Sequence, residues 1–161
     1  MRIHAKHASH LPAVIDALQR TEGDVLELGT GLYSTFALHW LCLYWDRRLV
    51  SYEHDLQYYR VVEHCWADWH ELYKVNTWEQ ADIERPWGVA LVDHGPPERR
   101  KIEIARLADH AQVIIAHDTQ SNQRHHYHYD EVWPSFKYLR SYNKARPHSV
   151  MASNFVDVTQ W

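Results

Sequence analysis

Residues 24–35 read DVLELGTGLYST and are the most informative stretch of the chain. Val25 to Leu28 form a short apolar run typical of a buried strand, the two glycines predict a turn, and an apolar helix begins near Ser34. Such a strand–turn–helix unit brings backbone N–H groups and a helix N-terminus close to a nucleotide-like ligand. Glu27 lies two positions before the first glycine, where a carboxylate would repel a pyrophosphate. We therefore expect a ligand that carries an amine or a positive charge.

The composition limits the class of protein. The 161 residues are enough for one domain with a hydrophobic core and too few for two, so we expect a single domain over residues 1–161. Hydrophobic residues make up 45% of the chain, which indicates a globular rather than a disordered protein. The formal net charge is -4 with histidine neutral, so no nucleic-acid partner is expected.

The cysteines and the N-terminal residues indicate in which cellular compartment the protein is expected. Cys42 and Cys65 both lie among apolar residues of helical patterns, where buried thiols are expected rather than a disulfide. The first seven residues contain no apolar signal core, and no run approaches the ~18 apolar residues that span a bilayer. These features predict a cytoplasmic protein with no membrane partner.

Strand and helix patterns alternate along the chain. Helices are expected where apolar residues recur at helical spacing, at 11–18, 34–45, 56–69, 96–108 and 132–142, with Ser9 as the N-cap of the first. Strands are expected at 25–28, 49–52, 72–75, 88–92, 112–116, 150–151 and 155–158. The alternation predicts an α/β fold: a Rossmann-like, mostly parallel, doubly wound sheet with a C-terminal antiparallel hairpin that turns near Ser153.

Acidic and histidine side chains gather at the ends of the predicted strands. Four strands end in such residues: Glu27, Glu53, Asp93-His94 and His117-Asp118. In an open α/β sheet the ligand lies beyond the carboxyl ends of the strands, so groups from distant parts of the chain meet there. The pattern therefore predicts one polar site. Within this site, we expect Asp93, His94, His117 and Asp118 to converge on one reacting group.

Three stretches resemble class I S-adenosylmethionine-dependent methyltransferases. Residues 27–33 resemble motif I, E-x-G-x-G-x-G, with Tyr33 in place of the third glycine. Residues 92–100, VDHGPPERR, resemble the V-D-G-P-P…R stretch of small-molecule O-methyltransferases with His94 inserted, and 114–118, IIAHD, is similar to their fifth-strand ending. The resemblance covers roughly residues 25–119. It implies S-adenosylmethionine as cofactor and a small-molecule acceptor that is methylated at a hydroxyl.

The resemblance also implies which residues hold the cofactor. Glu53, at the end of the second strand, matches the acid that binds the ribose hydroxyls, and Asp93 matches the acid that faces the methionine part or the substrate. Trp78, in a loop before the fourth strand, is a candidate for stacking on adenine. The whole set is Glu27, Gly29, Thr30, Gly31, Ser34, Thr35, Glu53, His54, Trp78 and Asp93.

A hydroxyl acceptor must lose its proton, either to a base or with the help of a metal ion. The candidates for catalysis are His94, His117 and Asp118. Either histidine could act as the base, because histidine titrates near neutral pH. Asp93, His117 and Asp118 are also candidates for a divalent metal, since matching acids hold one in catechol-type enzymes. Thr119 stands where the usual asparagine follows, and histidine at the site favours a softer metal than Mg²⁺.

Two other functions remain open on the sequence alone. Residues 29–34 nearly fit G-x-G-x-x-G/A, so an NAD(P)-binding oxidoreductase with Glu53 on a ribose is one alternative. A non-catalytic Rossmann-like subunit is the other. For the leading function, we expect the acceptor pocket to come from the N-terminal segment, from the loop at 120–129 or from a neighbouring subunit of a homo-oligomer.

Overall fold

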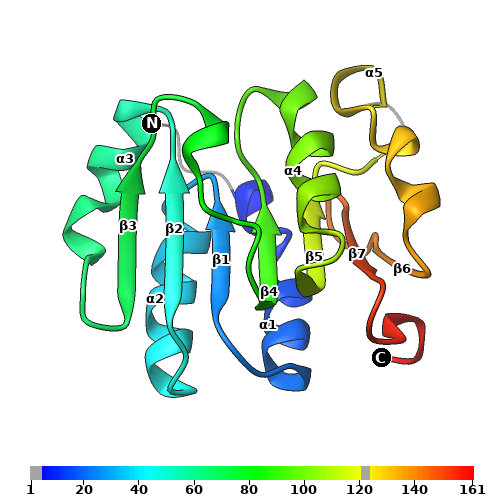
Figure 1. The fold of residues 1–161 in the computed structure, drawn as a ribbon, viewed down its shortest axis with the longest axis horizontal. Coiled ribbons are helices and arrows are strands. Elements are labelled where there is room, and N and C mark those ends of the chain that lie inside the picture. Colours follow the sequence, from blue (N-terminus) through cyan, green and yellow to red (C-terminus); the bar gives the residue numbers. More distant parts are fainter. Residues whose placement is uncertain (1–4, 121–123) are drawn as a thin grey trace.

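The computed structural model describes residues 5–120 and 124–161. Its centre is a seven-stranded sheet in the order β3-β2-β1-β4-β5-β7-β6 (Figure 1). The strands are β1 Val25–Leu28, β2 Leu49–Glu53, β3 His70–Lys74, β4 Trp87–Val92, β5 Ala111–His117, β6 Tyr138–Tyr142 and β7 Ser149–Ser153. Neighbours among β1 to β5 pair in parallel, whereas β7 is antiparallel to both β5 and β6. This topology confirms the predicted Rossmann-like sheet with its C-terminal hairpin.

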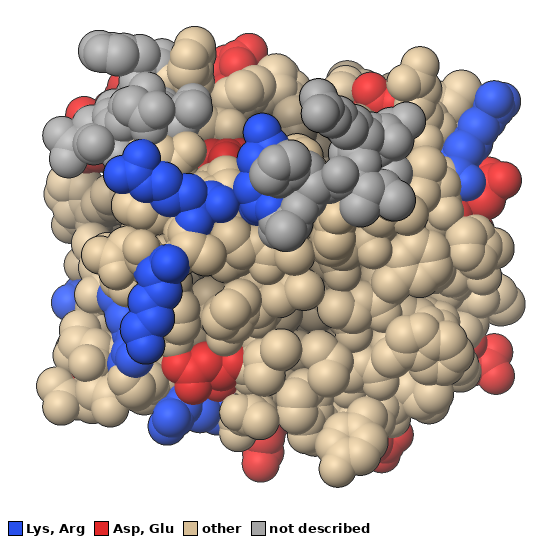
Figure 2. All heavy atoms as spheres, turned by 180° about the vertical axis from the view of Figure 1, so that it is seen from behind, with Lys and Arg blue, Asp and Glu red and all other residues tan. Residues whose placement is uncertain are grey.

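Helices cover both faces of the sheet. The α-helices are α1 Leu11–Arg20, α2 Ser34–Tyr44, α3 Leu56–Val62, α4 Arg100–Leu107 and α5 Arg124–Tyr127. Short 3₁₀ helices lie at Ala5–Ala8, Glu63–Cys65, Trp78–Gln80, Pro97–Arg99, Tyr129–Glu131, Trp133–Ser135 and Val158–Gln160. α1 and α2 pack on one face and α4 packs on the other (Figure 1). The face with α1 and α2 is mainly uncharged, and most of its basic side chains lie on the side of the C-terminal hairpin (Figure 2).

Side chains along β4 alternate between two hydrophobic cores. Ala90 and Val92 pack in the core beneath α4, whereas Val89 and Leu91 pack in the core beneath α1 and α2. Every residue of the strand is buried because helices cover the sheet on both faces. The same alternation decides on which face a side chain beyond the end of a strand emerges.

The C-terminal hairpin forms from other residues than those predicted. The helix expected at 132–142 is wrong, because its second half is β6, which pairs with β7. β6 is an edge strand whose side chains alternate between half-buried and exposed. The strand expected at 155–158 is also wrong. The hydroxyl of Ser153 accepts the N–H groups of Phe155 and Val156 at 3.0 and 2.9 Å, and these bonds turn the chain out of the sheet.

The predicted helix at 56–69 is too long. Asp55 caps it as expected, accepting the N–H of Gln57 at 2.7 Å, but α3 ends at Val62 and a 3₁₀ turn follows. Val62 is buried, but Trp66 lies beyond the helix and is 62% exposed, so the apolar stripe does not continue into the core at that position.

Both cysteines are free and buried, as predicted. No helix in the described part of the chain is long and apolar enough to cross a membrane.

Candidate functional site

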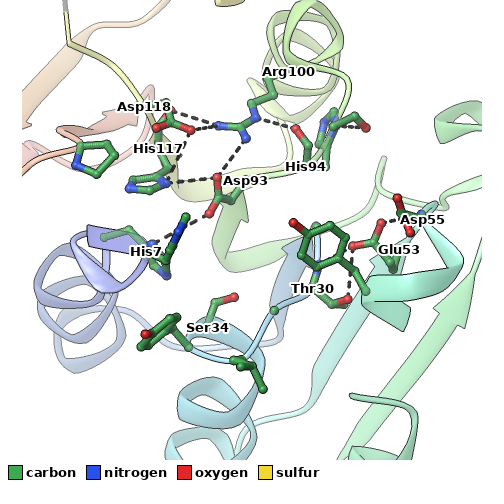
Figure 3. A pocket seen from close by; sticks show the side chains of 18 of the residues that line it. His7, Thr30, Ser34, Glu53, Asp55, Asp93, His94, Arg100, His117 and Asp118 are labelled. Carbon is green, nitrogen blue, oxygen red and sulfur yellow. Dashed lines mark hydrogen bonds and ion pairs between the residues drawn. The ribbon is translucent and has the colours of Figure 1, made fainter. Parts of the chain in front are cut away.

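One large cavity, of about 1260 Å³, opens where β1, β2, β4 and β5 end at their carboxyl edge (Figure 3). Ten of the residues singled out from the sequence line it: Gly29, Thr30, Gly31, Ser34, Glu53, His54, Asp93, His94, His117 and Asp118. Three others, Glu27, Thr35 and Trp78, are not among its lining residues. The parallel topology thus brings the glycine loop and the ends of three further strands to one place.

The two glycines of the loop serve different purposes. Gly29 has a φ of +92°, and a Cβ there would lie 2.6 Å from the backbone of His94. A side chain at this position would therefore push the ends of β1 and β4 apart. Gly31 borders the cavity, and a Cβ there would meet nothing within 4 Å. The absence of a side chain at Gly31 leaves space for a ligand and is not required by the packing of the chain.

The carboxylate of Glu53 ties the glycine loop to the end of β2 (Figure 3). One oxygen accepts the backbone N–H of Thr30 at 2.7 Å and its hydroxyl at 3.2 Å. The other accepts the backbone N–H groups of His54 and Asp55, both at 2.7 Å. Four donors fill the usual capacity of a carboxylate. A ribose hydroxyl can bind Glu53 by displacing the hydroxyl of Thr30, which makes the longest of the four bonds.

Glu27 lies beneath the loop, so the expected direct contact with a ligand is corrected. Its fully buried carboxylate accepts the hydroxyls of Thr35 at 3.0 Å and Ser51 at 2.7 Å. The hydroxyl of Thr35 in turn accepts the N–H of Gly31 at 2.9 Å. Glu27 and Thr35 therefore support the loop from below. Burial raises the pKa of Glu27 to about 7.

We expect the protonation of Glu27 to contribute to the pH dependence of stability. Its pKa rises from 4.5 to about 7 on folding, so the protonated side chain stabilises the folded state. This contribution to the free energy of unfolding is fully present below the unfolded pKa of 4.5, and it is lost as pH rises through the folded pKa of about 7. Glu27→Gln removes this loss. The free energy of unfolding of the variant minus that of the wild type should grow by about 3 kcal/mol from about pH 4 to about pH 8. Urea unfolding across that range measures it, and a difference independent of pH would contradict the expectation.

Trp78 lies below the cavity, which corrects its expected role in stacking on adenine. Its side chain is 3% exposed, and its indole N–H donates to the carbonyl of Gly95 at 2.8 Å. The ring packs against that of His94, with 4.1 Å between the centroids. Trp78 therefore supports the segment after β4 and has no open face for a cofactor.

His94 and His117 emerge on opposite faces of the sheet. Val92 pairs with Ala116, so Asp93 and His117 follow on the face of α1, and His94 follows on the face of α4. The His94 ring is buried, and its Nε2 lies 3.3 Å from Oε2 of Glu103 on α4. Burial lowers the pKa of His94. The expectation that His94 converges with His117 on an acceptor is wrong. His94 contributes only to the wall of the cavity.

Arg100 joins the ends of β4 and β5 (Figure 3). Its guanidinium lies 3.0 Å from the carboxylate of Asp93 and 3.2 Å from that of Asp118. It also donates to the carbonyls of His94 at 2.6 Å and His117 at 3.3 Å. The side chain is buried. This role of Arg100 was not predicted from the sequence. The available signal is its position about one helical turn after the prolines that follow β4.

His117 is held between Asp93 and Ser9. Its Nδ1 lies 3.1 Å from Asp93 Oδ1, and its Nε2 lies 2.9 Å from Ser9 Oγ. Because the hydroxyl of Ser9 donates to the carbonyl of Pro147 at 2.6 Å, it accepts from Nε2, so both ring nitrogens carry hydrogen. Burial alone would lower the pKa of His117, but the carboxylate of Asp93 outweighs it and the net shift is upward. Ser9 thus orients His117. The prediction that Ser9 is the N-cap of α1 is wrong, because His10 occupies that position.

His10, which was not anticipated, completes this part of the site. It directly precedes α1 and is 1% exposed, and its Nδ1 lies 3.9 Å from Asp93 Oδ2. Its ring meets that of His117 edge-on, with 4.8 Å between the centroids. Neither ring nitrogen has a hydrogen-bond partner among the residues that the structure describes. Burial lowers the pKa of His10 to about 4, so the ring is neutral at physiological pH.

Residues 121–123 of the loop expected to cover the acceptor lie outside the described part of the chain. Beyond them, two buried tyrosines support the end of β5. The hydroxyl of Tyr127 donates to the carboxylate of Asp118 at 2.9 Å, and that of Tyr129 donates to the carbonyl of His117 at 2.8 Å. The carboxylate of Asp118 therefore binds Tyr127 and Arg100, and it lies 3.8 Å from Nδ1 of His117.

No protein-family model and no curated protein matches the sequence. The structure, however, is similar to solved methyltransferases. The O-methyltransferase TomG from Streptomyces achromogenes, involved in tomaymycin synthesis and solved in complex with S-adenosylmethionine, has a TM-score of 0.65 and 13% identity. That match covers 96% of this chain and 82% of TomG. The fold is that of the class I S-adenosylmethionine-dependent methyltransferases.

Two further matches agree with this fold. A methyltransferase from Pyrococcus furiosus has a TM-score of 0.60 and 15% identity over 90% of this chain and 83% of its own. The METTL16 methyltransferase domain has a TM-score of 0.63 and 10% identity over 97% of this chain and 70% of its own. At such low identity these matches establish the fold alone. They lend no support to the nicotinamide alternative.

Proposed function

We propose that the protein transfers a methyl group from S-adenosylmethionine to a hydroxyl of a small-molecule acceptor. The observation that carries the proposal is one continuous cavity, bordered by the glycine loop and Glu53 in one part and by Asp93 and His117 in another. Its volume of about 1260 Å³ exceeds the ~300–1,000 Å³ of a pocket for one drug-sized ligand. The space therefore suits a cofactor and an acceptor side by side.

The loop side of the cavity suits the cofactor. When bound, S-adenosylmethionine supplies a methyl group on a positively charged sulfur, and it also carries an ammonium group. Carboxylates along the cavity, those of Glu53, Asp55 and Asp93, favour such a ligand electrostatically. Gly31 leaves room for it, and Ser34 and His54 border the same space. We assign the ribose to Glu53, in exchange for the hydroxyl of Thr30.

The Asp93–His117 pair is suited to act on the acceptor. Methyl transfer to a hydroxyl requires removal of its proton, and the rest of the catalysis is largely positioning. His117 borders the cavity, and Asp93 and Ser9 fix its orientation. An acid that binds Nδ1 orients the ring for proton transfer at the other nitrogen. The acceptor hydroxyl would take the place of Ser9 at Nε2 once His117 has lost a proton.

A small-molecule acceptor agrees with the charge of the chain. A net charge of -4 gives no general attraction to a polyanion, so a nucleic acid is not the acceptor we expect. The likeness to TomG, which is involved in tomaymycin synthesis, points the same way. A cytoplasmic location and a homo-oligomer stay predictions.

Gly31→Val tests the assignment of the cofactor side. A valine there meets open space, so the variant should fold with a stability close to wild type, yet its side chain should enter the space of the ligand. We expect its affinity for S-adenosylmethionine to fall by more than about tenfold, measured by calorimetric titration. In contrast, Gly29→Ala should lose stability first, because its Cβ clashes with the backbone of His94.

The same titration decides between the proposed function and its alternatives. Unchanged affinity in Gly31→Val would contradict the placement of the cofactor. Binding of NAD(P) but not S-adenosylmethionine to the wild type would favour the oxidoreductase. If neither bound at millimolar concentration, the non-catalytic subunit would be the better account.

A further inference from the structure

Three potential metal ligands from distant parts of the chain meet on the α1 side of the cavity. His10 precedes α1, Asp93 follows β4 and His117 ends β5. One nitrogen or oxygen atom from each lies within 4.8 Å of the others. Two imidazoles and one carboxylate are thus close enough together to share one ion, and all three residues border the cavity.

His10 is the informative member of this group. It is 1% exposed, and both of its ring nitrogens lack a hydrogen-bond partner among the described residues. A buried polar atom without a partner is costly, and such a group usually marks the place of a water molecule or an ion, or has a catalytic role. The neutral ring offers a free lone pair beside Asp93, whose Oδ2 is 3.9 Å away.

The charges around the group favour a bound cation once His117 has lost its proton. Arg100 is shared between two carboxylates, those of Asp93 and Asp118. One negative charge therefore remains, and a proton on His117 compensates for it in this structure. Oδ1 of Asp93 binds Arg100 and His117, so Oδ2 is the oxygen that faces His10. A carboxylate that is held at one oxygen and open at the other is pre-oriented as a ligand.

We propose that His10, Asp93 and His117 bind a divalent transition-metal ion. Two nitrogen ligands and one oxygen ligand favour ions such as Zn²⁺, Co²⁺ or Fe²⁺ over Mg²⁺, which prefers oxygen. The set differs from the expected Asp93, His117 and Asp118, because Asp118 is turned to Arg100 and Tyr127. Binding replaces the Nδ1 proton of His117, which leaves to solvent.

The functional consequence rests on the proposed function. An ion at this place would face the hydroxyl of the acceptor and lower its pKa by coordination. His117 would then act as a ligand and no longer as the base. The binding of the ion itself can be measured without the acceptor.

The test is a titration of the full-length, chelator-stripped protein with Co²⁺, followed by its visible absorption. We expect saturation at one ion per chain and no displacement by a millimolar excess of Mg²⁺. His10→Ala should weaken binding by about a hundredfold or more. His7→Ala is the matched control, because His7 is a second histidine at the cavity outside the group, and it should bind Co²⁺ like the wild type.

Circular dichroism and a titration with S-adenosylmethionine on the same samples separate the outcomes. If the wild type bound the cofactor but gave no Co²⁺ spectrum, the metal site would be refuted and the proposed function would stand. Equal Co²⁺ affinity in folded His10→Ala and wild type would also refute it. If His10→Ala were unfolded, His10→Gln, which keeps a polar side chain but no imidazole, should give the same loss.

Discussion

Turnover should fall by about 10²- to 10⁴-fold in His117→Ala, while the affinity for S-adenosylmethionine stays close to that of the wild type. The imidazole lies in the part of the cavity that we assign to the acceptor and is bonded to Asp93 and Ser9 rather than to the glycine loop. Its loss should therefore remove chemistry and leave the cofactor contacts. The measurement is transfer of labelled methyl to a panel of phenols and catechols, with cofactor affinity from calorimetry.

A second histidine variant controls for the loss of an imidazole as such. His64 is exposed in the 3₁₀ helix after α3 and is not among the residues that line the cavity, so His64→Ala should keep wild-type turnover. Turnover in His117→Ala within about threefold of the wild type would be inconsistent with both the base and the metal-ligand roles of His117. Methyl transfer to an RNA oligonucleotide but to no phenol would instead replace the small-molecule acceptor.

Arg100→Met should lower the free energy of unfolding by about 3–5 kcal/mol, because it removes one partner of a buried ion pair. The carboxylates of Asp93 and Asp118, each about one-fifth exposed, would then face each other without their shared cation. The carbonyl of His94 would lose its donor as well, whereas that of His117 would keep the hydroxyl of Tyr129. Urea denaturation measures the change.

Two variants show whether geometry or charge matters at Arg100. Arg100→Lys keeps the charge but cannot reach all four partners, so it should recover only part of the stability. Lys101→Met removes the neighbouring surface pair with Glu131, and it should cost far less stability than Arg100→Met. Equal effects of Arg100→Met and Lys101→Met would show that Arg100 does not hold the two strand ends together.

The parallel half of the fold could be predicted from the sequence because its signals are local. Residues 25–28 and 88–92 are apolar runs that end in polar groups, and each is followed by turn residues. The edge strand β6 could not be predicted in this way. Its side chains alternate weakly, and it becomes a strand by pairing with β7, a contact that no local pattern encodes.

The strand ends that carry the site were predictable, but the directions of their side chains were not. Asp93 and His94 are adjacent and must point to opposite faces, yet which of them joins His117 depends on the register between β4 and β5. His10 lies 83 positions before Asp93, and nothing in the pattern of α1 distinguishes it from an ordinary histidine at the start of a helix. Contacts of this kind arise from tertiary packing alone.

A crystal structure of the protein with S-adenosylhomocysteine tests most directly whether the cavity binds the cofactor. We expect the adenosine over Gly29 and Gly31, a ribose hydroxyl on Glu53 in place of the Thr30 hydroxyl, and the sulfur turned toward Asp93 and His117. Electron density for the ligand elsewhere, or an undisturbed Thr30–Glu53 bond with the cavity empty at saturating ligand, would contradict the assignment of this cavity to methyl transfer.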